Sequence, residues 1–448
     1  MHLAGWLYRD AVILVGLFAS LPTVLPISMT DTSTPSDDNP HKAGTVRAAL
    51  ASRDFRLVWY GAFASNIGTW MQNVVLPAYI YHRTGKASLV GLLIFAQLGP
   101  LLFLSIPAGV LADKFERRKW LVSMQIVQLV FSCALAVLAL GTPAVWMLFL
   151  AALGVGIGNA MNAPAWSAML PSLVRPEDLS GALALNSTVI NGSRVIGPII
   201  VAVFSQWGAT TAQFFFVNAA TYLFVIVALL SVNIPTFVPD PTKGWRRFTR
   251  GLAIARHRPT VRRLLITLAT FSFLSLPYVG LFPAVARLNF GIAEDSSTYK
   301  WLYATWGFGA ALGGLAIGTT FAQSDKRRLI QYGFAGFALS MLCFALSRSP
   351  LPAFIFGFFL GFAYFFATTA MVTVIQSRLE PEVRGRVMAL WFMAFGGTVP
   401  LGNLLFGPLI DRHGSQWLLL LGSAWALFLA RWCDIKSLDE AAIKNSTR

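Results

Sequence analysis

The chain has 448 residues, of which 56% are hydrophobic and only 12% are charged. Soluble globular domains carry about 25% charged residues, so this composition, with a mean hydropathy of +0.63, excludes a soluble enzyme, a disordered protein and a fibrous one. The apolar residues come in long runs and not in alternating short strands, which argues against an outer-membrane barrel. The sequence therefore predicts an all-α, multi-pass membrane protein.

Twelve apolar segments, each bounded by charged residues, proline or glycine, follow one another along the chain. The first six lie at about 57–81, 88–111, 120–140, 145–170, 181–205 and 211–233. The second six lie at about 262–286, 299–322, 329–347, 351–377, 387–410 and 416–430. Since a helix needs about 20 apolar residues to cross a bilayer, we expect twelve transmembrane helices in two six-helix bundles.

The two sets of six segments repeat one another at a constant offset of 205 residues. Arg175-Pro176-Glu177 recurs as Glu380-Pro381-Glu382. The same offset pairs three glycines of the first set with three of the second: Gly109 with Gly314, Gly192 with Gly397, and Gly197 with Gly402. A parallel duplication of this kind places the substrate site near the bilayer midplane, between two pseudo-symmetric bundles.

The net charge of +16 is distributed unevenly between the loops. With the segment before the first span on the cytoplasmic side, 27 Lys and Arg residues fall on that side and 6 on the other. Lys and Arg concentrate in cytoplasmic loops, so both termini of the twelve-helix core are expected in the cytoplasm. The positive charge is thus a topology signal, and no nucleic-acid partner is expected. Arg outnumbers Lys by 26 to 9, which suggests a high-GC bacterium and hence its cell (inner) membrane.

These patterns predict five regions along the chain. They are an N-terminal extension at 1–52, a bundle at 53–233, a basic cytoplasmic linker at 234–261, a second bundle at 262–434 and a cytoplasmic tail at 435–448. The apolar run 11–29 conflicts with this topology, because one more span or a signal peptide there would invert every later loop. We expect translation to start at Met29, which makes residues 1–28 a start-site artefact; a surface-lying or re-entrant segment is the alternative.

Metal, cofactor and catalytic signatures are not found in the sequence. Cys133, Cys343 and Cys433 lie far apart in apolar segments, and the five histidines form no ligand-spaced cluster. There is no HExxH motif, nucleophile elbow or pair of intramembrane carboxylates. We therefore expect no metal, no cofactor and no enzymatic activity.

The loop after the second span reads G-V-L-A-D-K-F-E-R-R from Gly109 to Arg118. This spacing resembles the loop 2–3 signature of the major facilitator superfamily, and with it the major facilitator fold. In that family the Asp and Arg of the motif interact with neighbouring helix ends and hold the halves together on the cytoplasmic side. The resemblance implies a role in conformational change for five residues of this loop and for two arginines at the start of span eleven. They are Gly109, Asp113, Lys114, Arg117 and Arg118 in the loop, and Arg384 and Arg386 at span eleven.

Three further segments narrow the resemblance to one branch of the superfamily. SNIGTWMQNVVLPAYIY, NAPAWSAMLPSLVRPEDLSGALALNS and RGRVMALWFMAFGGTVPLGNLLFGPLIDRHG are similar to enterobactin exporters and macrolide efflux proteins. The resemblance implies a secondary transporter that exports small drug-like or siderophore-like molecules by alternating access, with protons as a candidate coupling ion. The chain departs from this branch before Pro164, where Asn162 replaces the usual acidic residue, and at Gly318, where Asp113 would repeat.

Facilitators line their cavity mainly with spans one, four, seven and ten, and each of these spans carries polar side chains here. The candidates are Asn66, Trp70 and Asn73; Asn159, Asn162 and Trp166; Ser275 and Tyr278; and Tyr364, Thr368 and Gln376. Amides and hydroxyls in hydrocarbon need partners, so they either line the cavity or join helices by hydrogen bonds. Neutral polar groups interleaved with aromatic rings favour a bulky amphipathic substrate.

Arg194 is the only charged residue deep within a predicted span. An arginine at mid-membrane costs at least ~2.5 kcal/mol, so its side chain should face the protein interior. It either gates the transporter or binds an anionic group, or it pairs with carbonyls and amides. No Asp or Glu lies near the centre of a span, so proton coupling rests on the resemblance alone. Other functions left open are import, lipid movement within the same fold, and a non-transporting receptor or scaffold.

Overall fold

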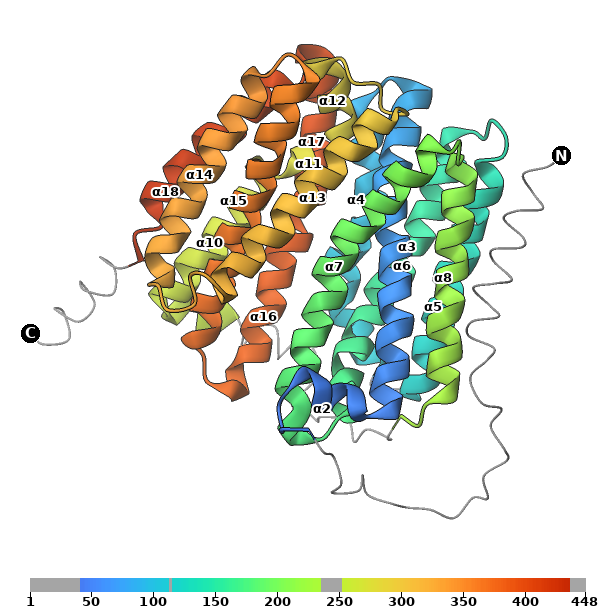
Figure 1. The fold of residues 1–448 in the computed structure, drawn as a ribbon, viewed down its shortest axis with the longest axis vertical. Helices are drawn as coiled ribbons and strands as arrows, with labels where there is room; N and C mark the ends of the chain where they lie inside the picture. Colours follow the sequence, from blue (N-terminus) through green and yellow to red (C-terminus); the bar gives the residue numbers. More distant parts are fainter. Residues whose placement is uncertain (1–40, 113–114, 235–251, 436–448) are drawn as a thin grey trace, which may run out of the picture. The chain divides into compact units, whose positions relative to one another are not determined.

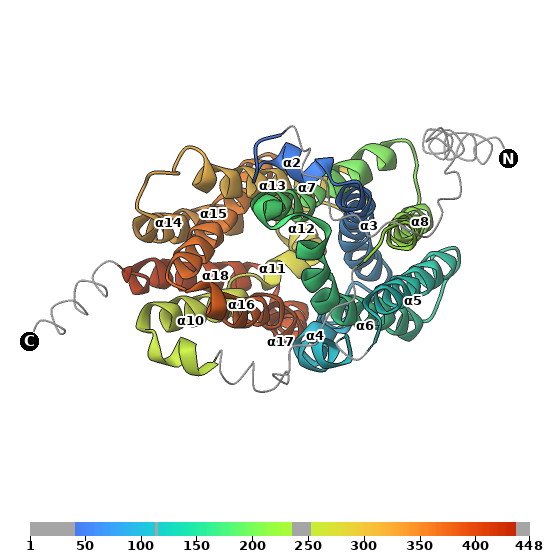
Figure 2. The same ribbon diagram turned by 90° about the horizontal axis from the view of Figure 1, so that it is seen from below.

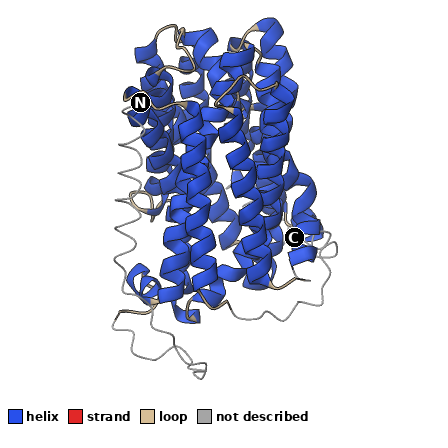
Figure 3. Ribbon diagram, turned by 90° about the vertical axis from the view of Figure 1, so that its right-hand side faces the viewer, coloured by secondary structure: helices blue, strands red, loops and turns tan. Residues whose placement is uncertain are grey.

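The structure is a computed structural model that describes residues 41–112, 115–234 and 252–435. Throughout these ranges the regular elements are helices, as Figure 3 shows. We call residues 41–234 the first half and residues 252–435 the second half. The lower end is the end at which α2 lies in Figure 1, and the upper end is the opposite one. The apolar run 11–29 lies outside the described residues.

The first half begins with a short helix and continues with long ones. Its helices are α2 (Val46–Ala51), α3 (Arg53–Thr84), α4 (Ala87–Ala112), α5 (Arg117–Leu138), α6 (Val145–Met169), α7 (Leu179–Gln206) and α8 (Thr211–Ser231). Local sequence signals set the ends of α3. The hydroxyl of Ser52 accepts from the N–H of Phe55, and Gly85 ends the helix with a φ of 63°, which glycine adopts without strain.

The second half contains one span that is broken into three helices. Its helices are α10 (Pro259–Leu274), α11 (Pro277–Gly280), α12 (Phe282–Phe290), α13 (Ser297–Gly318), α14 (Lys326–Leu346), α15 (Pro350–Ser377), α16 (Pro381–Gly396), α17 (Thr398–His413) and α18 (Gln416–Trp432). The single helix expected over 262–286 is interrupted near prolines 277 and 283, because each lacks the N–H that would continue the helical hydrogen bonds; both lie in the first turn of a new helix.

Each of the twelve predicted segments coincides with one helix or a consecutive series of helices. Among the described residues, eight helices are long and apolar enough to cross a bilayer. The all-α fold is confirmed, whereas the count of twelve transmembrane helices and the five region boundaries stay predictions. Helix α10 starts within the predicted linker 234–261, and the tail from 436 onward lies outside the described ranges.

The most extensive contacts between the halves are made by two helix pairs, α4 with α17 and α7 with α13 (Figure 2). Glycine permits the close approach of α4 and α17. A Cβ at Gly91 would lie 2.2 Å from the carbonyl oxygen of Asn403, and one at Gly407 would lie 2.7 Å from that of Ala87. The main hydrophobic core includes residues of both halves, whereas a smaller core of α2, α3, α5, α6, α7 and α8 belongs to the first half alone.

Within the second half, α13 packs so closely on α15 that the backbones of these two helices are in contact at Gly313. A Cβ at Gly313 would lie 2.0 Å from the carbonyl oxygen of Phe362, whereas at Gly314 the nearest atom would be 3.6 Å away. We expect Gly313→Ala to lower the free energy of unfolding by about 1–3 kcal/mol, because the helices must separate. The matched Gly314→Ala should be neutral or slightly stabilising, since alanine favours helix. Thermal unfolding followed by tryptophan fluorescence checks this, and equal Tm values for the two variants would contradict it.

Candidate functional site

A pocket of about 140 Å³ lies inside the first half, between α3, α4, α5, α6 and α8. We call it the amide pocket, because its polar lining is uncharged and consists mostly of Asn and Gln. The polar residues that line it are Ser65, Asn66, Thr69, Asn73, Gln97, Gln125, Gln128, Asn159, Asn162 and Tyr222. The structure thus brings together all four asparagines proposed from spans one and four. The glutamines were not among the predicted candidates, although each is an amide within an apolar helix.

Hydrogen bonds hold part of the amide pocket in place. Gln97 donates through Nε2 to Oδ1 of Asn73 at 2.9 Å, and Gln125 donates through Nε2 to Oδ1 of Asn162 at 3.4 Å. The other polar atom of Gln125, Oε1, is buried and has no hydrogen-bond partner among the described residues. A buried acceptor without a donor is unfavourable, so this oxygen is placed to accept from a water molecule or from a neutral donor on a ligand.

A second polar cluster lies fully inside the first half and has the character of a helix-joining network. Asn218 donates through Nδ2 to Oε1 of Gln72 at 2.7 Å, and the hydroxyl of Ser132 donates to the same oxygen at 3.4 Å. All three side chains are buried. They do not line the amide pocket, so we assign them to packing between α3, α5 and α8.

Arg194 lies on α7 at the junction of the two halves. Its guanidinium carbon is 4.7 Å from the ring centroid of Trp70 in the first half and 4.1 Å from that of Phe365 in the second. Across the junction, a Cβ at Gly307 of α13 would lie 3.0 Å from the carbonyl oxygen of Arg194. We call Trp70, Arg194 and Phe365 the arginine site.

The two aromatic faces compensate only part of the cost of the Arg194 charge. Cation–π contacts contribute about 0.5–2 kcal/mol, and they leave the N–H groups of the guanidinium unused. Nε and Nη1 of Arg194 are buried without a hydrogen-bond partner in the part of the chain that the structure describes. A carboxylate, phenolate or carbonyl oxygen of a ligand fits these donors. The arginine site thus places two buried donors without partners beside one aromatic ring from each half.

The polar candidates of spans seven and ten lie mostly in the core of the second half. Tyr278 accepts a hydrogen bond of 2.9 Å from Nε1 of Trp306, and Ser275 donates to the carbonyl of Gly422 at 2.9 Å. Thr368 donates to the carbonyl of Tyr364, whose ring stacks on Trp306. The hydrogen bonds of Ser275 and Tyr278 favour the interhelical alternative, whereas Thr368 bonds within α15 and Tyr364 contacts α13 through its ring alone.

Two more candidates lie away from both sites. Trp166 packs against the smaller core of the first half, and the exposed Gln376 contacts the sulfur of Met388 at 3.8 Å. Trp70, Arg194 and the four asparagines are thus the candidates that line the amide pocket or the arginine site. Their part in transport stays a prediction.

The conformational motif is only partly described. Asp113 and Lys114 lie outside the described residues, as do the side-chain surroundings of Gly109 and Arg386. The three remaining arginines donate to main-chain carbonyls: Arg117 to Ala168 at 3.3 Å, Arg118 to Leu230, and Arg384 to Leu379 at 3.3 Å. Ala168 and Leu230 belong to the last turns of α6 and α8, where the helix dipole favours a cation.

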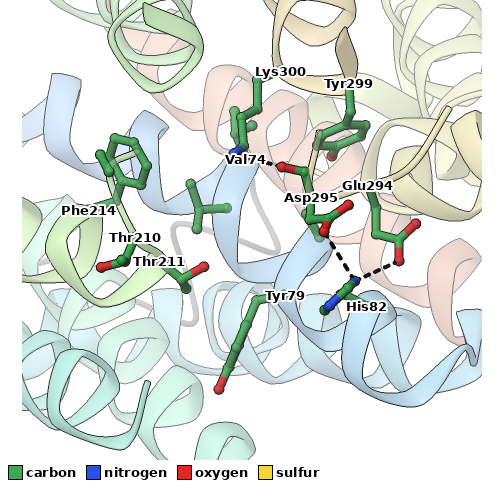
Figure 4. Close-up of a pocket in the computed structure, with 13 residues that line it drawn as sticks. Val74, Tyr79, His82, Thr210, Thr211, Phe214, Glu294, Asp295, Tyr299 and Lys300 are labelled. Carbon is green, nitrogen blue, oxygen red and sulfur yellow. Dashed lines mark hydrogen bonds and ion pairs between the residues drawn. The ribbon is translucent and has the colours of Figure 1, made fainter. Parts of the chain in front are cut away.

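At the upper end, side chains of the two halves meet around a pocket of about 210 Å³ (Figure 4). Nδ1 of His82, in the last turn of α3, lies 3.2 Å from Oε1 of Glu294 and 3.8 Å from Oδ2 of Asp295. Both carboxylates come from the segment between α12 and α13. None of these three residues was among the predicted site residues.

A second contact between the halves lies at the same end. The carboxylate of Asp411, in the last turn of α17, accepts from the N–H of Ala87 at 2.6 Å and from that of Ser88 at 3.0 Å. These N–H groups begin α4, so a residue of the second half caps a helix of the first. We call the contacts of Asp411 and of Glu294 with the first half the upper closure.

At the lower end, three arginines of the described ranges hydrogen-bond to partners in their own half. Arg117 and Arg118 bind carbonyls of the first half, and Arg258 binds both oxygens of Glu380 in the second half at 2.9 and 2.7 Å. The backbone N–H of Glu380 and the Arg258 guanidinium together lower the pKa of that carboxyl. The upper closure joins the two halves, so it favours a conformation that is shut at the upper end.

Comparison with known proteins shows similarity over nearly the whole chain. A family described as "Transmembrane secretion effector" matches residues 44–446. Macrolide efflux protein A of Streptococcus pyogenes is 26% identical over 394 residues, which are 82% of this chain and 92% of that protein. The staphyloferrin A transporter of Staphylococcus aureus is 24% identical over 366 residues, or 79% and 88%. A crystal structure of a nucleoside transporter matches with a TM-score of 0.70 at 12% identity, covering 85% of this chain and 99% of that one.

Proposed function

Since the chain belongs to the transmembrane secretion effector family of major facilitator transporters, we propose that it exports small amphipathic molecules by alternating access. The family predicted from the sequence motifs is confirmed, and so is the major facilitator fold. The protein is a multi-pass membrane transporter. The names of its relatives, which refer to macrolide efflux and to staphyloferrin A transport, support a substrate of the drug or siderophore class.

The observation that carries this proposal is the position of Arg194 between the halves. Alternating access exposes a site between two halves first to one side of the membrane and then to the other. Trp70 and Phe365 belong to different halves, so a group held by the arginine site is released when the halves rearrange. An aromatic or apolar body would stack on the rings, and an anionic or carbonyl oxygen would accept from the guanidinium.

The amide pocket extends the proposed site into the first half. Asn66, Trp70 and Asn73 follow one another at helical spacing on α3, where residues three or four apart are neighbours on one face. A substrate bound at Trp70 can therefore place a neutral hydrogen-bonding group among the amides. This combination suits an amphipathic molecule better than a sugar phosphate, whose charge would need several basic residues.

The loop charges support an orientation for this transporter. Arg117, Arg258 and the other described residues of the larger basic group flank the lower end, which we propose to be cytoplasmic. The upper closure then faces outward from the cell (inner) membrane, and the structure corresponds to a state shut on the outside. Protons remain a candidate coupling ion.

Transport in proteoliposomes tests the proposal. We expect protein-dependent movement of a fluorescent amphipathic carboxylate, and a roughly tenfold lower rate for Trp70→Ala, because loss of a stacking ring weakens both the Arg194 contact and the substrate contact. Trp146→Ala is the matched control, since Trp146 is 60% exposed on α6 and does not line the amide pocket or the arginine site. Movement of small hydrophilic anions but of no amphipathic probe would contradict the proposal, as would equal rates for the two variants.

A further inference from the structure

Gln125 brings a buried acceptor without a partner into the amide pocket. The residue lies on α5, lines the pocket and is 5% exposed. Its Nε2 donates to Oδ1 of Asn162 at 3.4 Å, whereas its Oε1 is buried and has no hydrogen-bond partner among the described residues. An unpaired buried carbonyl oxygen is costly, so a donor from outside the protein would stabilise this side chain.

The other two glutamines of the pocket have the same polarity. Nε2 of Gln97 donates to Oδ1 of Asn73 at 2.9 Å, and Nε2 of Gln128 donates to the carbonyl of Met124 at 3.3 Å. Both glutamines are buried, and within the described ranges neither side-chain oxygen accepts a hydrogen bond. The buried amides of the pocket therefore donate to the protein and leave their oxygens for a ligand.

Two asparagines of the same lining have the opposite polarity. Oδ1 of Asn73 and Oδ1 of Asn162 accept from the glutamines, which leaves the two Nδ2 groups as donors. Both asparagines are half-buried, so the inner part of the pocket presents acceptors and the less buried part presents donors. None of the lining side chains is charged. A cationic donor would lack a counter-charge there, so a neutral O–H or N–H group fits the inner part best.

We propose that Gln125 is a specificity-determining residue of the export site, and that it selects substrates with an O–H or N–H donor on the part that enters the amide pocket. A donor there completes the hydrogen bonding of Oε1. A ketone or ether oxygen has no hydrogen to donate and would place a second acceptor beside the first. Sites built to hydrogen-bond a substrate hydroxyl discriminate against the analogue that lacks it. This inference rests on the proposed export of amphipathic molecules and narrows their class to hydrogen-bond donors.

A pair of probes that differ in one group tests the proposal. Both are fluorescent amphipathic carboxylates of nearly the same size. One ends in a secondary alcohol, and the other ends in the corresponding methyl ketone, which accepts hydrogen bonds but does not donate them. We expect the unaltered protein to bind the alcohol about tenfold more tightly than the ketone, because the alcohol pairs with a buried acceptor that the ketone leaves unpaired. Equilibrium fluorescence titration gives the ratio of the two Kd values, and initial rates in proteoliposomes should show the same preference.

Three variants complete the design. Gln125→Met is similar in length but lacks the acceptor, so the two probes should bind about equally. Ser132→Ala is the matched control, because Ser132 is a buried polar residue of α5 that does not line the pocket; it should keep the preference for the alcohol. Asn162→Ala removes the acceptor that orients the Gln125 amide. This amide can then turn and donate to the ketone, so the preference should also fall, even where Gln125→Met does not fold.

The outcomes separate this inference from the proposed export. Equal Kd values for the two probes in the unaltered protein would show that water satisfies Oε1 of Gln125 and would overturn the inference. An unchanged preference in both Gln125→Met and Asn162→Ala would overturn it too, as would binding of neither probe. Preferential binding of the alcohol without any transport would refute export and leave the Gln125 assignment standing. Transport of both probes at equal rates would refute the assignment and leave export standing.

Discussion

Arg194→Ala should reduce export of an anionic amphipathic probe roughly ten- to hundredfold below saturation, while the protein stays folded. Nε and Nη1 of Arg194 are buried without partners among the described residues, so the substrate would be their acceptor. A hydrogen bond to a charged group contributes about 1.5–3 kcal/mol, and each 1.4 kcal/mol is a factor of ten. The folded state loses little, because removing an unpaired buried charge also removes its desolvation cost.

Two further variants separate substrate binding from charge and from packing. Arg194→Lys keeps the charge but loses the planar guanidinium. Its export rate should therefore lie between that of the unaltered protein and that of Arg194→Ala. Arg263→Ala is the matched control, because Arg263 also stacks on a tryptophan, at 4.4 Å from the Trp432 ring, and also has a buried Nε without a partner. It lies within the second half and should leave export unchanged. Initial rates in proteoliposomes decide the matter, and equal losses for Arg194→Ala and Arg263→Ala would reject a substrate contact.

Arg194 and the four asparagines could be predicted because a charge or an amide stands out in an apolar helix. Helical spacing then placed Asn66 and Asn73 on one face of α3, which agrees with their common pocket. The same reasoning failed to separate them from Tyr278 and Ser275, which have similar polarity but lie in the core. The difference depends on Trp306 and Gly422, which are 28 and 147 positions away and supply the hydrogen bonds.

Glu294 could not be predicted, because its burial is a property of two distant segments. In the sequence it belongs to the polar stretch from Gly291 to Ser297, which reads as an exposed loop. Its partner His82 lies 212 positions earlier, in the last turn of α3, just beyond the end at about 81 that the sequence predicted for this span. No local periodicity reports such a pairing, so the search for a carboxylate at the centre of a span overlooked one at its edge.

Asp411 holds the halves together by capping a helix that it does not belong to. The first N–H groups of a helix have no partner within it, and the helix dipole adds positive charge there. The carboxylate of Asp411 meets both needs at the start of α4, where it accepts from Ala87 and Ser88. Opening of the upper end would separate α17 from α4, so these two hydrogen bonds stabilise only the closed arrangement.

We therefore expect Asp411→Ala to raise the ratio of open to closed states roughly ten- to hundredfold near neutral pH, since it removes two hydrogen bonds to a charged group. The distance between spin labels at Lys86 and Thr298, which are exposed and belong to different halves, measures this shift. Asp325→Ala is the matched control, because Asp325 caps α14 within its own half by accepting from the N–H of Arg327. Losing that cap should lower the free energy of unfolding by about 1 kcal/mol without changing the distance between the labels. If both variants gave the distances of the unaltered protein, capping by Asp411 would not be what keeps the upper end shut.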